Sequence, residues 1–274
     1  MEKYLKEIVT KLSVPGLRNA TGENWPQAMK IIYEEILKIG YEPIIQEWHD
    51  EKGTYRNFIV RIKGQKKEKF ILGAHYDTHE DTPGADDNAS AVAVMFGILK
   101  NIKRTPFFSW ELVFYACEEP PFFGTNQMGS HVHASEIQKD SIKCMICLEM
   151  VGFYSNEQDS QNYPFKWMKW IYGNKGNFIL GVSKGGVEAR RIMQKLKSKS
   201  PGFYKKLFIP FGLSGLDWSD HRNYWKYKIP AIMLTDTAMF RNDNYHKKTD
   251  LPDTLDYNKM NLLANNLTFL INKE

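Results

Sequence analysis

The chain has 274 residues, with 37 basic and 32 acidic side chains, a net charge of +5 and 42% hydrophobic residues. This composition excludes a disordered segment, a collagen-like repeat and a coiled coil. The length lies near the upper limit for one hydrophobic core, so we expect a single domain over residues 1–274. Because no apolar stretch approaches the roughly 18 residues of a membrane span, and the lysine groups lack a recognition motif, we expect neither a membrane nor a nucleic acid as partner.

The N-terminus predicts an amphipathic helix, with Leu5, Ile8, Val9 and Leu12 at helical spacing. An export signal has a continuous apolar run instead, so the chain as given is typical of a cytoplasmic protein, unless a signal was removed from a secreted form. The cysteines, which form an odd and sparse set, argue against a disulfide framework and are expected to be buried. They are Cys117, Cys144 and Cys147.

Strand and helix patterns alternate along the chain. A helix is expected from Pro26 to Gly40, and a hairpin with its turn at Lys52-Gly53 follows. Alternation of this kind predicts an α/β fold in which helices cover both faces of a central mixed, mostly parallel sheet, giving three αβα layers. Strands are expected at 44–48, 55–62, 70–74, 110–116, 142–148, 178–182 and 231–234, and later helices at 89–102, 187–196 and 256–271.

Polar side chains follow several of these strands directly. His75 and Asp77 come after one buried strand, Glu118 and Glu119 after a second, and Glu149 after a third. Ligands of open α/β sheets bind outside the carboxyl ends of the strands, so these segments are expected to converge. Buried carboxylates need compensating charge, and imidazole with carboxylate but no thiolate suits zinc.

At these positions the sequence resembles the M28 metallopeptidases, which are co-catalytic dizinc exopeptidases. The resemblance runs from about Gly73 to Asp250. It rests on five blocks in the family's order: Gly-Ala-His-Tyr-Asp-Thr from Gly73, Pro-Gly-Ala-Asp-Asp-Asn-Ala-Ser from Pro83, Ala-Cys-Glu-Glu from Ala116, Ser219-Asp220-His221, and Tyr245-His246.

The resemblance implies a two-zinc site with one bridging carboxylate. His75 and Glu149 would bind one ion and Glu119 and His246 the other, with Asp87 bridging both. Many aminopeptidases of the family have Asp where Glu149 stands, which leaves the substrate preference open.

Two further residues receive roles by the same resemblance. Glu118 matches the general base, and Asp77 matches the acid that orients the His75 imidazole.

Asp86 or Asp87 is expected to cap the following helix. Near the site in sequence are residues that could line a substrate pocket: Phe153, Tyr154, Trp218, Met239 and Phe240.

The implied reaction is hydrolysis of a peptide bond at the end of a peptide or small peptide-like substrate, most simply by an aminopeptidase. A carboxypeptidase or dipeptidase of the same fold would bind a carboxylate through a base such as Arg241. A glutaminyl-cyclase-like acyltransferase and a non-catalytic binding domain are further alternatives. A serine hydrolase is disfavoured because the Gly-x-Ser-x-Gly elbow is missing. His131 and His133 are interpreted as structural or surface residues, and His221 as a residue that supports the site without binding metal. The oligomeric state is left open.

Overall fold

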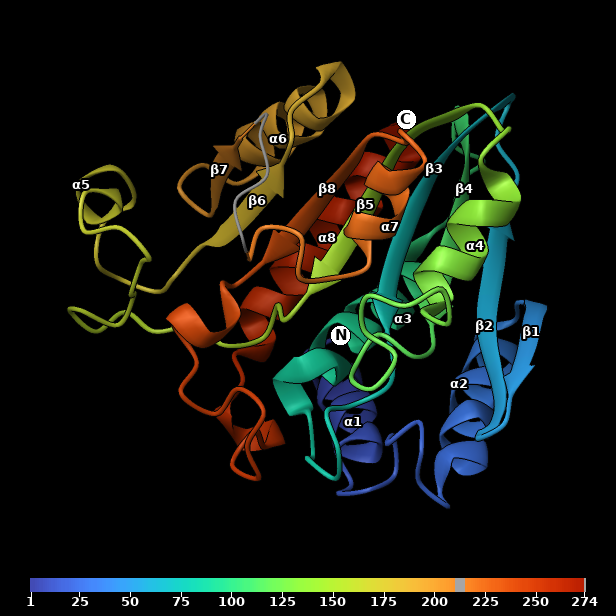
Figure 1. Cartoon of the computed structure of the whole chain (residues 1–274). Helices are drawn as coiled ribbons and strands as arrows, with labels where there is room; N and C mark the ends of the chain where they lie inside the picture. Colours follow the sequence, from blue (N-terminus) through green and yellow to red (C-terminus); the bar gives the residue numbers. More distant parts are fainter. Residues whose placement is uncertain (210–214, 274) are drawn as a thin grey trace.

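A computed structural model describes residues 1–209 and 215–273 and shows one sheet of eight strands between two layers of helices (Figure 1). The spatial order of the strands is β1-β2-β4-β3-β5-β8-β6-β7. Their bounds are Ile44–Asp50 (β1), Gly53–Ile62 (β2), Lys66–His75 (β3), Phe108–Tyr115 (β4), Ile142–Glu149 (β5), Ile179–Ser183 (β6), Tyr204–Phe208 (β7) and Ala231–Thr235 (β8).

The sheet is mixed, as predicted. Strands β4, β3, β5 and β8 run parallel to one another in its centre. The hairpin β1–β2 pairs antiparallel with this block through β4, and β6 pairs antiparallel with β8. Because the four central strands share one direction, their carboxyl ends lie at the same edge of the sheet, which is where the sequence places its polar blocks.

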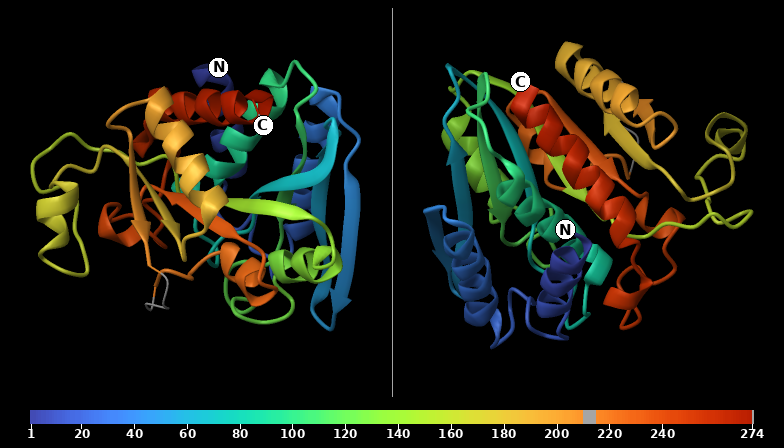
Figure 2. Two further views of the ribbon diagram at one scale, coloured as in Figure 1. Left: turned by 90° about the horizontal axis from the view of Figure 1, so that it is seen from above. Right: turned by 180° about the vertical axis from the view of Figure 1, so that it is seen from behind.

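Helices cover both faces of the sheet, which confirms the three-layer architecture (Figure 2). One layer packs α3 (Ala91–Asn101) against α8 (Tyr257–Lys273) and α1 (Glu2–Leu12). The other layer contains α4 (Gly129–Ile137) and α7 (His221–Lys226). The remaining helices are α2 (Trp25–Ile39), α5 (Met168–Tyr172) and α6 (Val187–Lys199).

Strand β7 and the short helices α5 and α7 escaped the sequence patterns. Strand β7 lies at the edge of the sheet and contains Lys205 and Lys206, which interrupt its apolar residues. Helix α5 has only five residues, too few for a helical repeat to show. Among residues 1–209 and 215–273, no helix combines the length and the apolar character needed to cross a bilayer.

Candidate metal centre

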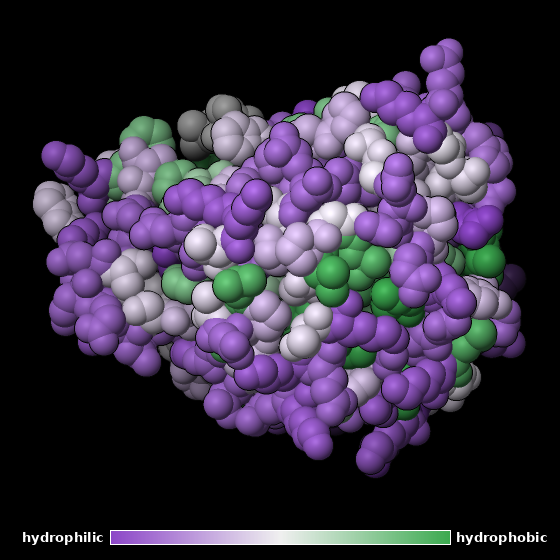
Figure 3. All heavy atoms as spheres, turned by 90° about the horizontal axis from the view of Figure 1, so that it is seen from below, coloured by the Kyte–Doolittle hydropathy of each residue, from purple (hydrophilic) through white to green (hydrophobic). Residues whose placement is uncertain are grey.

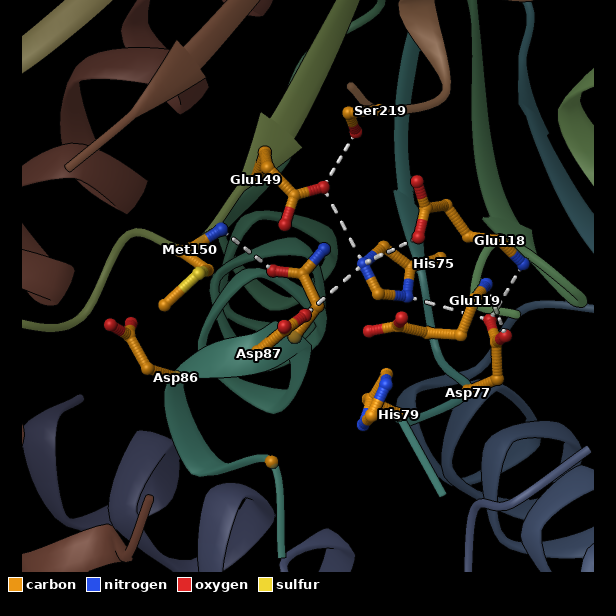
Figure 4. Close-up of polar contacts among 12 residues, drawn as sticks. His75, Asp77, His79, Asp86, Asp87, Glu118, Glu119, Glu149, Met150 and Ser219 are labelled. Atoms are coloured by element: carbon orange, nitrogen blue, oxygen red, sulfur yellow. Dashed lines mark hydrogen bonds and ion pairs between the residues drawn. The ribbon is translucent and has the colours of Figure 1, made fainter. Parts of the chain in front are cut away.

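The five residues expected to bind metal lie together at the carboxyl edge of the sheet. Figure 4 shows four of them, namely His75, Asp87, Glu119 and Glu149. His75 and Glu149 are the last residues of β3 and β5, and Glu119 follows β4. Asp87 belongs to an irregular helical turn, Ala85–Ser90, directly before α3, and His246 to the loop after β8. Four separate connections of the chain therefore converge on one buried point.

The side chains form two groups that share Asp87. The His75 Nε2 atom lies 3.5 Å from Asp87 Oδ1 and 3.4 Å from Glu149 Oε2. The His246 Nε2 atom lies 3.1 Å from Asp87 Oδ2 and 3.4 Å from Glu119 Oε1. Each group offers three ligand atoms within 4.8 Å of one another, and a third overlapping group joins His75, Glu118 and Glu119. Asp87 thus directs one carboxylate oxygen at His75 and the other at His246.

Unpaired polar atoms show that these groups fit metal ions. The Nε2 atom of His75 and the Oδ1 atom of Asp87 are buried without a hydrogen-bond partner among the described residues. Buried polar atoms of this kind are costly unless something binds them. A donor set of imidazole nitrogens and carboxylate oxygens suits zinc.

Asp77 connects the first imidazole to the end of β4. Its Oδ1 atom lies 3.4 Å from His75 Nδ1. The same carboxylate accepts hydrogen bonds from the backbone N–H groups of Glu118 (3.1 Å) and Glu119 (2.9 Å). One side chain therefore orients the His75 ring and fixes the backbone that carries both glutamates.

Burial and neighbouring charges set the protonation of the acidic residues. Burial raises the pKa of Glu118 well above its usual value, with the adjacent Glu119 and Glu149 carboxylates adding to the effect. Burial and the Asp87 carboxylate raise the pKa of Glu119 to about 7. Asp87 differs from these glutamates. Burial alone would raise its pKa, but the hydrogen bond from His246 and the charge of His75 lower it below its usual value.

The surrounding carboxylates raise the pKa values of the two imidazoles, His75 and His246. Burial alone would lower the pKa of His75, but the Glu149 and Glu118 carboxylates raise it well above the usual value. Burial likewise opposes protonation of His246, but its contacts with Asp87 and Glu119 raise its pKa to about 10. Without metal, the site therefore balances its carboxylates by holding protons.

Hydrogen bonds hold the Asp87 backbone in place. The peptide bond between Asp87 and Asn88 is cis. The Asn88 side chain donates to the Leu148 carbonyl oxygen and accepts from the Met150 N–H, both at 3.0 Å, which ties this turn to the end of β5. The Asp250 carboxylate accepts from the N–H groups of Asp86 and Asp87.

The expectation that Asp86 or Asp87 caps the following helix is wrong. Neither side chain makes a capping hydrogen bond. The Asp86 carboxylate instead accepts from the Gly152 N–H at 2.8 Å and from the Asn242 side chain at 2.8 Å. Each of the two Asp86 carboxylate oxygens is thus bound by a distant segment of the chain and does not cap the helix.

Arg18 is a supporting residue that sequence reasoning missed. It lies in the loop between α1 and α2 and is fully buried. Its guanidinium donates to the carbonyl oxygens of Tyr76 (3.1 Å), Pro83 (2.9 Å) and Gly84 (2.5 Å), so it holds the loop between His75 and Asp87. Gly84 has a φ of +57°, and a Cβ there would lie 2.2 Å from the Asp87 carbonyl oxygen. Nothing in the local pattern around Arg18 indicates this role.

The Ser219-Asp220-His221 block supports the site without entering either group. The Ser219 hydroxyl donates to Glu149 Oε2 at 2.5 Å, which fixes that carboxylate. His221 is buried at the start of α7 with its Nε2 atom 2.8 Å from the Leu216 carbonyl oxygen. His133 is also buried and contacts the Tyr224 hydroxyl at 2.6 Å, in agreement with its structural interpretation.

A largely apolar pocket of about 110 Å³ opens beside Glu149. Trp218, Met239 and Phe240 line it as expected. Phe153 and Tyr154 do not and instead pack against the hydrophobic core. Further lining comes from the sheet and from the segment before α5, namely Leu180, Val182, Met233, Tyr163 and Met168. Viewed from below, the molecular surface is mostly hydrophilic with hydrophobic side chains gathered near its middle (Figure 3).

The three cysteines are buried and unpaired, as predicted. Arg241 is also buried. Its guanidinium donates to the Gln161 side chain (2.9 Å) and the Phe153 carbonyl oxygen (3.2 Å) and packs against the Tyr154 and Phe178 rings. It does not line the pocket beside Glu149.

Two known proteins are similar to this chain in sequence. An uncharacterized Escherichia coli protein, YfbL, is 36% identical over 94% of this chain and 81% of its own length. A probable leucine aminopeptidase of Trichophyton verrucosum is 25% identical over 84% of this chain; the chain spans only 59% of that protein's length.

Solved structures show the same fold. The Legionella pneumophila LapA aminopeptidase superposes with a TM-score of 0.76 at 16% identity, covering 100% of this chain and 72% of that one. A Bacteroides thetaiotaomicron glutaminyl cyclase shares the fold too, with a TM-score of 0.71 at 16% identity, covering 100% of this chain and 98% of that one. Residues 57–271 match the signature of Peptidase family M28, and the chain belongs to this family of peptidases.

Proposed function

We propose that this protein is a zinc-dependent aminopeptidase with two ions per chain. His75, Asp87 and Glu149 hold one ion, and Asp87, Glu119 and His246 hold the other. The observation that carries the proposal is the shared Asp87, whose two oxygens face His75 and His246 separately. The similarity to probable leucine aminopeptidases supports the same activity.

Bound zinc ions supply two kinds of chemistry, activation of a water and polarisation of a carbonyl group. In our proposal the protein's own base is Glu118, which lies 3.9 Å from His75 Nε2 and belongs to neither of these two groups. It takes the proton of the attacking water and returns it to the leaving amine. Asp77 holds the His75 ring and the Glu118 backbone in position during both proton transfers.

The surroundings favour a substrate's amino end over its carboxyl end. An ammonium group is attracted by negative charge, and the centre is lined by carboxylates. A carboxylate group needs an accessible cation, but the Arg241 guanidinium is buried and lies outside the pocket beside Glu149; its Nε and Nη1 atoms are bonded, and its Nη2 atom has no partner among the described residues. The apolar pocket beside Glu149 then receives the first side chain of the substrate.

Matched short peptides test the choice of terminus. One carries an apolar first residue and an amidated C-terminus, and the other has the same sequence with an acetylated N-terminus. Our proposal predicts cleavage of the amidated peptide alone, with release of its first residue. Cleavage of the acetylated peptide from its carboxyl end would identify a carboxypeptidase instead.

A peptide that begins with glutamine distinguishes peptide hydrolysis from the reaction of a glutaminyl-cyclase-like acyltransferase. Hydrolysis releases free glutamine and shortens the peptide by one residue. Cyclisation releases ammonia and leaves the number of residues unchanged. We expect hydrolysis, because each of the two three-ligand groups is complete in this chain.

A further inference from the structure

The charge of this protein is strongly divided along the chain. Residues 160–209 contain 11 lysines and arginines but a single acidic residue, Glu188, for a net charge of +10. The rest of the chain holds 26 basic and 31 acidic residues, a net charge of −5. The overall +5 therefore conceals one strongly basic region. Such asymmetry is typical of a surface that binds an anionic partner.

The structure gathers this region at one end of the sheet. Residues 160–209 form α5, β6, α6 and β7, which lie together at the β7 edge (Figures 1 and 2). Exposed basic side chains there are Lys166, Lys169, Lys184, Arg190 and Lys206, of which Lys169 pairs with Asp159, one position before this range. Glu188, the one acid of the region, already pairs with Lys143 and Arg191.

Exposed apolar side chains project from the same edge. Residues 163–175, which we call the arm, surround α5. Trp170 is 90% exposed and Ile171 65%, and Trp167 and Phe165 are also exposed. Isolated exposed apolar residues are ordinary, but four within seven consecutive positions form a patch that marks an interaction surface.

Hydrogen bonds hold the arm in a defined shape. The Tyr163 hydroxyl donates to the Gly173 carbonyl oxygen at 2.9 Å, which closes the arm on itself. The Tyr172 hydroxyl donates to the Lys206 carbonyl oxygen at 2.9 Å, and Lys205 Nζ donates back to the Tyr172 carbonyl oxygen. The arm is thus fixed to β7, with Met168 directed inward and Trp170 and Ile171 outward.

The chemistry of this surface selects among possible partners. A second copy would bring two basic edges together, which their charge opposes. A nucleic acid would suit the lysines and could stack on tryptophan, but it offers nothing to Ile171 or to Val187, which is 81% exposed at the start of α6. An anionic lipid surface matches both features, because lysines attract its headgroups while tryptophan and aliphatic side chains enter the headgroup boundary.

We propose that the arm and the basic β7 edge dock this protein onto membranes that contain anionic lipids. The expectation of no membrane partner rested on the missing spanning segment, and peripheral docking requires none. The arm also contributes Tyr163 and Met168 to the pocket beside Glu149. The residues replaced in the test, namely Trp170, Ile171, Lys166 and Lys175, neither belong to the metal centre nor line the pocket.

Co-sedimentation with vesicles tests the proposal. The full chain is mixed with vesicles of phosphatidylcholine alone, or of phosphatidylcholine with phosphatidylglycerol, at low and high salt. We expect binding to the anionic vesicles that weakens with salt. The double variant Trp170→Ala/Ile171→Ala should lose most of it. Lys166→Gln/Lys175→Gln should lose about 30-fold in affinity, because each lysine near an anionic surface contributes roughly a factor of 5.

Matched variants elsewhere on the surface serve as controls. Val14→Ala removes a half-exposed apolar side chain, and Lys63→Gln/Lys67→Gln removes two exposed lysines, all remote in sequence from the arm. These should bind vesicles like the parent, and thermal melting verifies that every variant is folded. The proposal is overturned if no vesicle is bound, if neutral vesicles bind as well, or if the control variants lose as much as the arm variants. Binding to single-stranded nucleic acid without vesicle binding, or an arm-dependent dimer without it, would also overturn the proposal.

Discussion

The imidazole ring of His79 lies face to face with that of His246, with the ring centroids 4.0 Å apart and the planes inclined by 13°. His246 needs such support more than the other proposed ligands, because it lies in a loop, has a φ of +56° and is 26% exposed. Tyr245 also stacks on it, at 3.7 Å. The position of the second metal group therefore depends on ring packing as well as on hydrogen bonds.

Replacing His79 by alanine should weaken zinc binding about 10-fold, the lower end of the effect of losing a residue that supports a metal ligand. His79→Phe keeps a flat ring against His246 and should bind zinc nearly as well as the parent. Titration with a zinc indicator measures both affinities. If the alanine variant binds zinc as tightly as the phenylalanine variant, the stacking has no role in metal binding.

The two neighbouring glutamates should respond differently to neutralisation. Glu118→Gln removes the proposed base and should lower turnover by about 10²–10⁴ while the bound zinc stays unchanged. Glu119→Gln removes a ligand of the second group and should lower zinc content together with turnover. The zinc content and the rate of peptide hydrolysis, measured for each variant, test these two roles. Equal loss of zinc in both variants would show that the roles within the pair are assigned wrongly.

The metal-free protein should lose stability as the pH rises. The pKa of Glu119 is raised from 4.5 to about 7, so the folded state holds its proton through a range in which the unfolded state releases it. The pKa of His246 is raised from 6.5 to about 10, so its stabilising contribution is complete below pH 6.5 and is lost as the pH approaches 10. Because the unfolded state binds fewer protons in both windows, the free energy of unfolding falls with pH. Urea denaturation between pH 5 and pH 9 measures this trend, and a rising stability would contradict it.

Zinc binding should release protons for the same reason. The ligands bind in their deprotonated forms, and at pH 6.5 the metal-free centre holds protons on Glu119 and His246. Calorimetry in buffers of different ionisation enthalpy counts the protons released. The number of protons released on zinc binding should fall above pH 8, because Glu119 is already ionised there.

Arg18 should be important for stability although it touches no proposed ligand. Arg18→Met leaves the carbonyl oxygens of Tyr76, Pro83 and Gly84 without their shared donor, and hydrogen bonds from a charged group contribute about 1.5–3 kcal/mol each. We expect a loss of at least about 3 kcal/mol in the free energy of unfolding, measured in urea. The exposed Arg104, replaced by methionine in the same way, should change it little. Comparable losses in the two variants would refute the supporting role.

Local pattern predicted most of the sheet, whereas the proposed ligands were assigned through the resemblance to the M28 family. The run from Phe70 to Ala74 marks a buried strand, and His75 follows it at a point that parallel topology brings to the common edge. Arg18 could not be found in this way, because it reaches its partners across 58 to 66 positions of the chain. The cap expected at Asp86 failed for a similar reason, since Gly152 and Asn242 bind its carboxylate from distant segments.

The pocket shows the same division between local and tertiary information. Trp218, Met239 and Phe240 were expected near the site from their position in sequence, and they line the pocket. Tyr154 was expected there too, but its ring packs beside Phe203 and the Arg241 guanidinium. Proximity to a ligand in sequence places a residue near the site, whereas the path of the loop decides which way its side chain points.

The central claim is that two zinc ions share the Asp87 carboxylate, and metal stoichiometry tests it most directly. The protein is stripped with a chelator, reloaded with zinc in steps, and its zinc content and aminopeptidase activity are measured at each step. Our account predicts that the stripped protein is inactive and that full activity returns at about two equivalents. It also predicts that Asp87→Asn, which alters both groups at once, loses both equivalents. Full activity in the stripped protein, or retention of both ions by the Asp87 variant, would contradict the account.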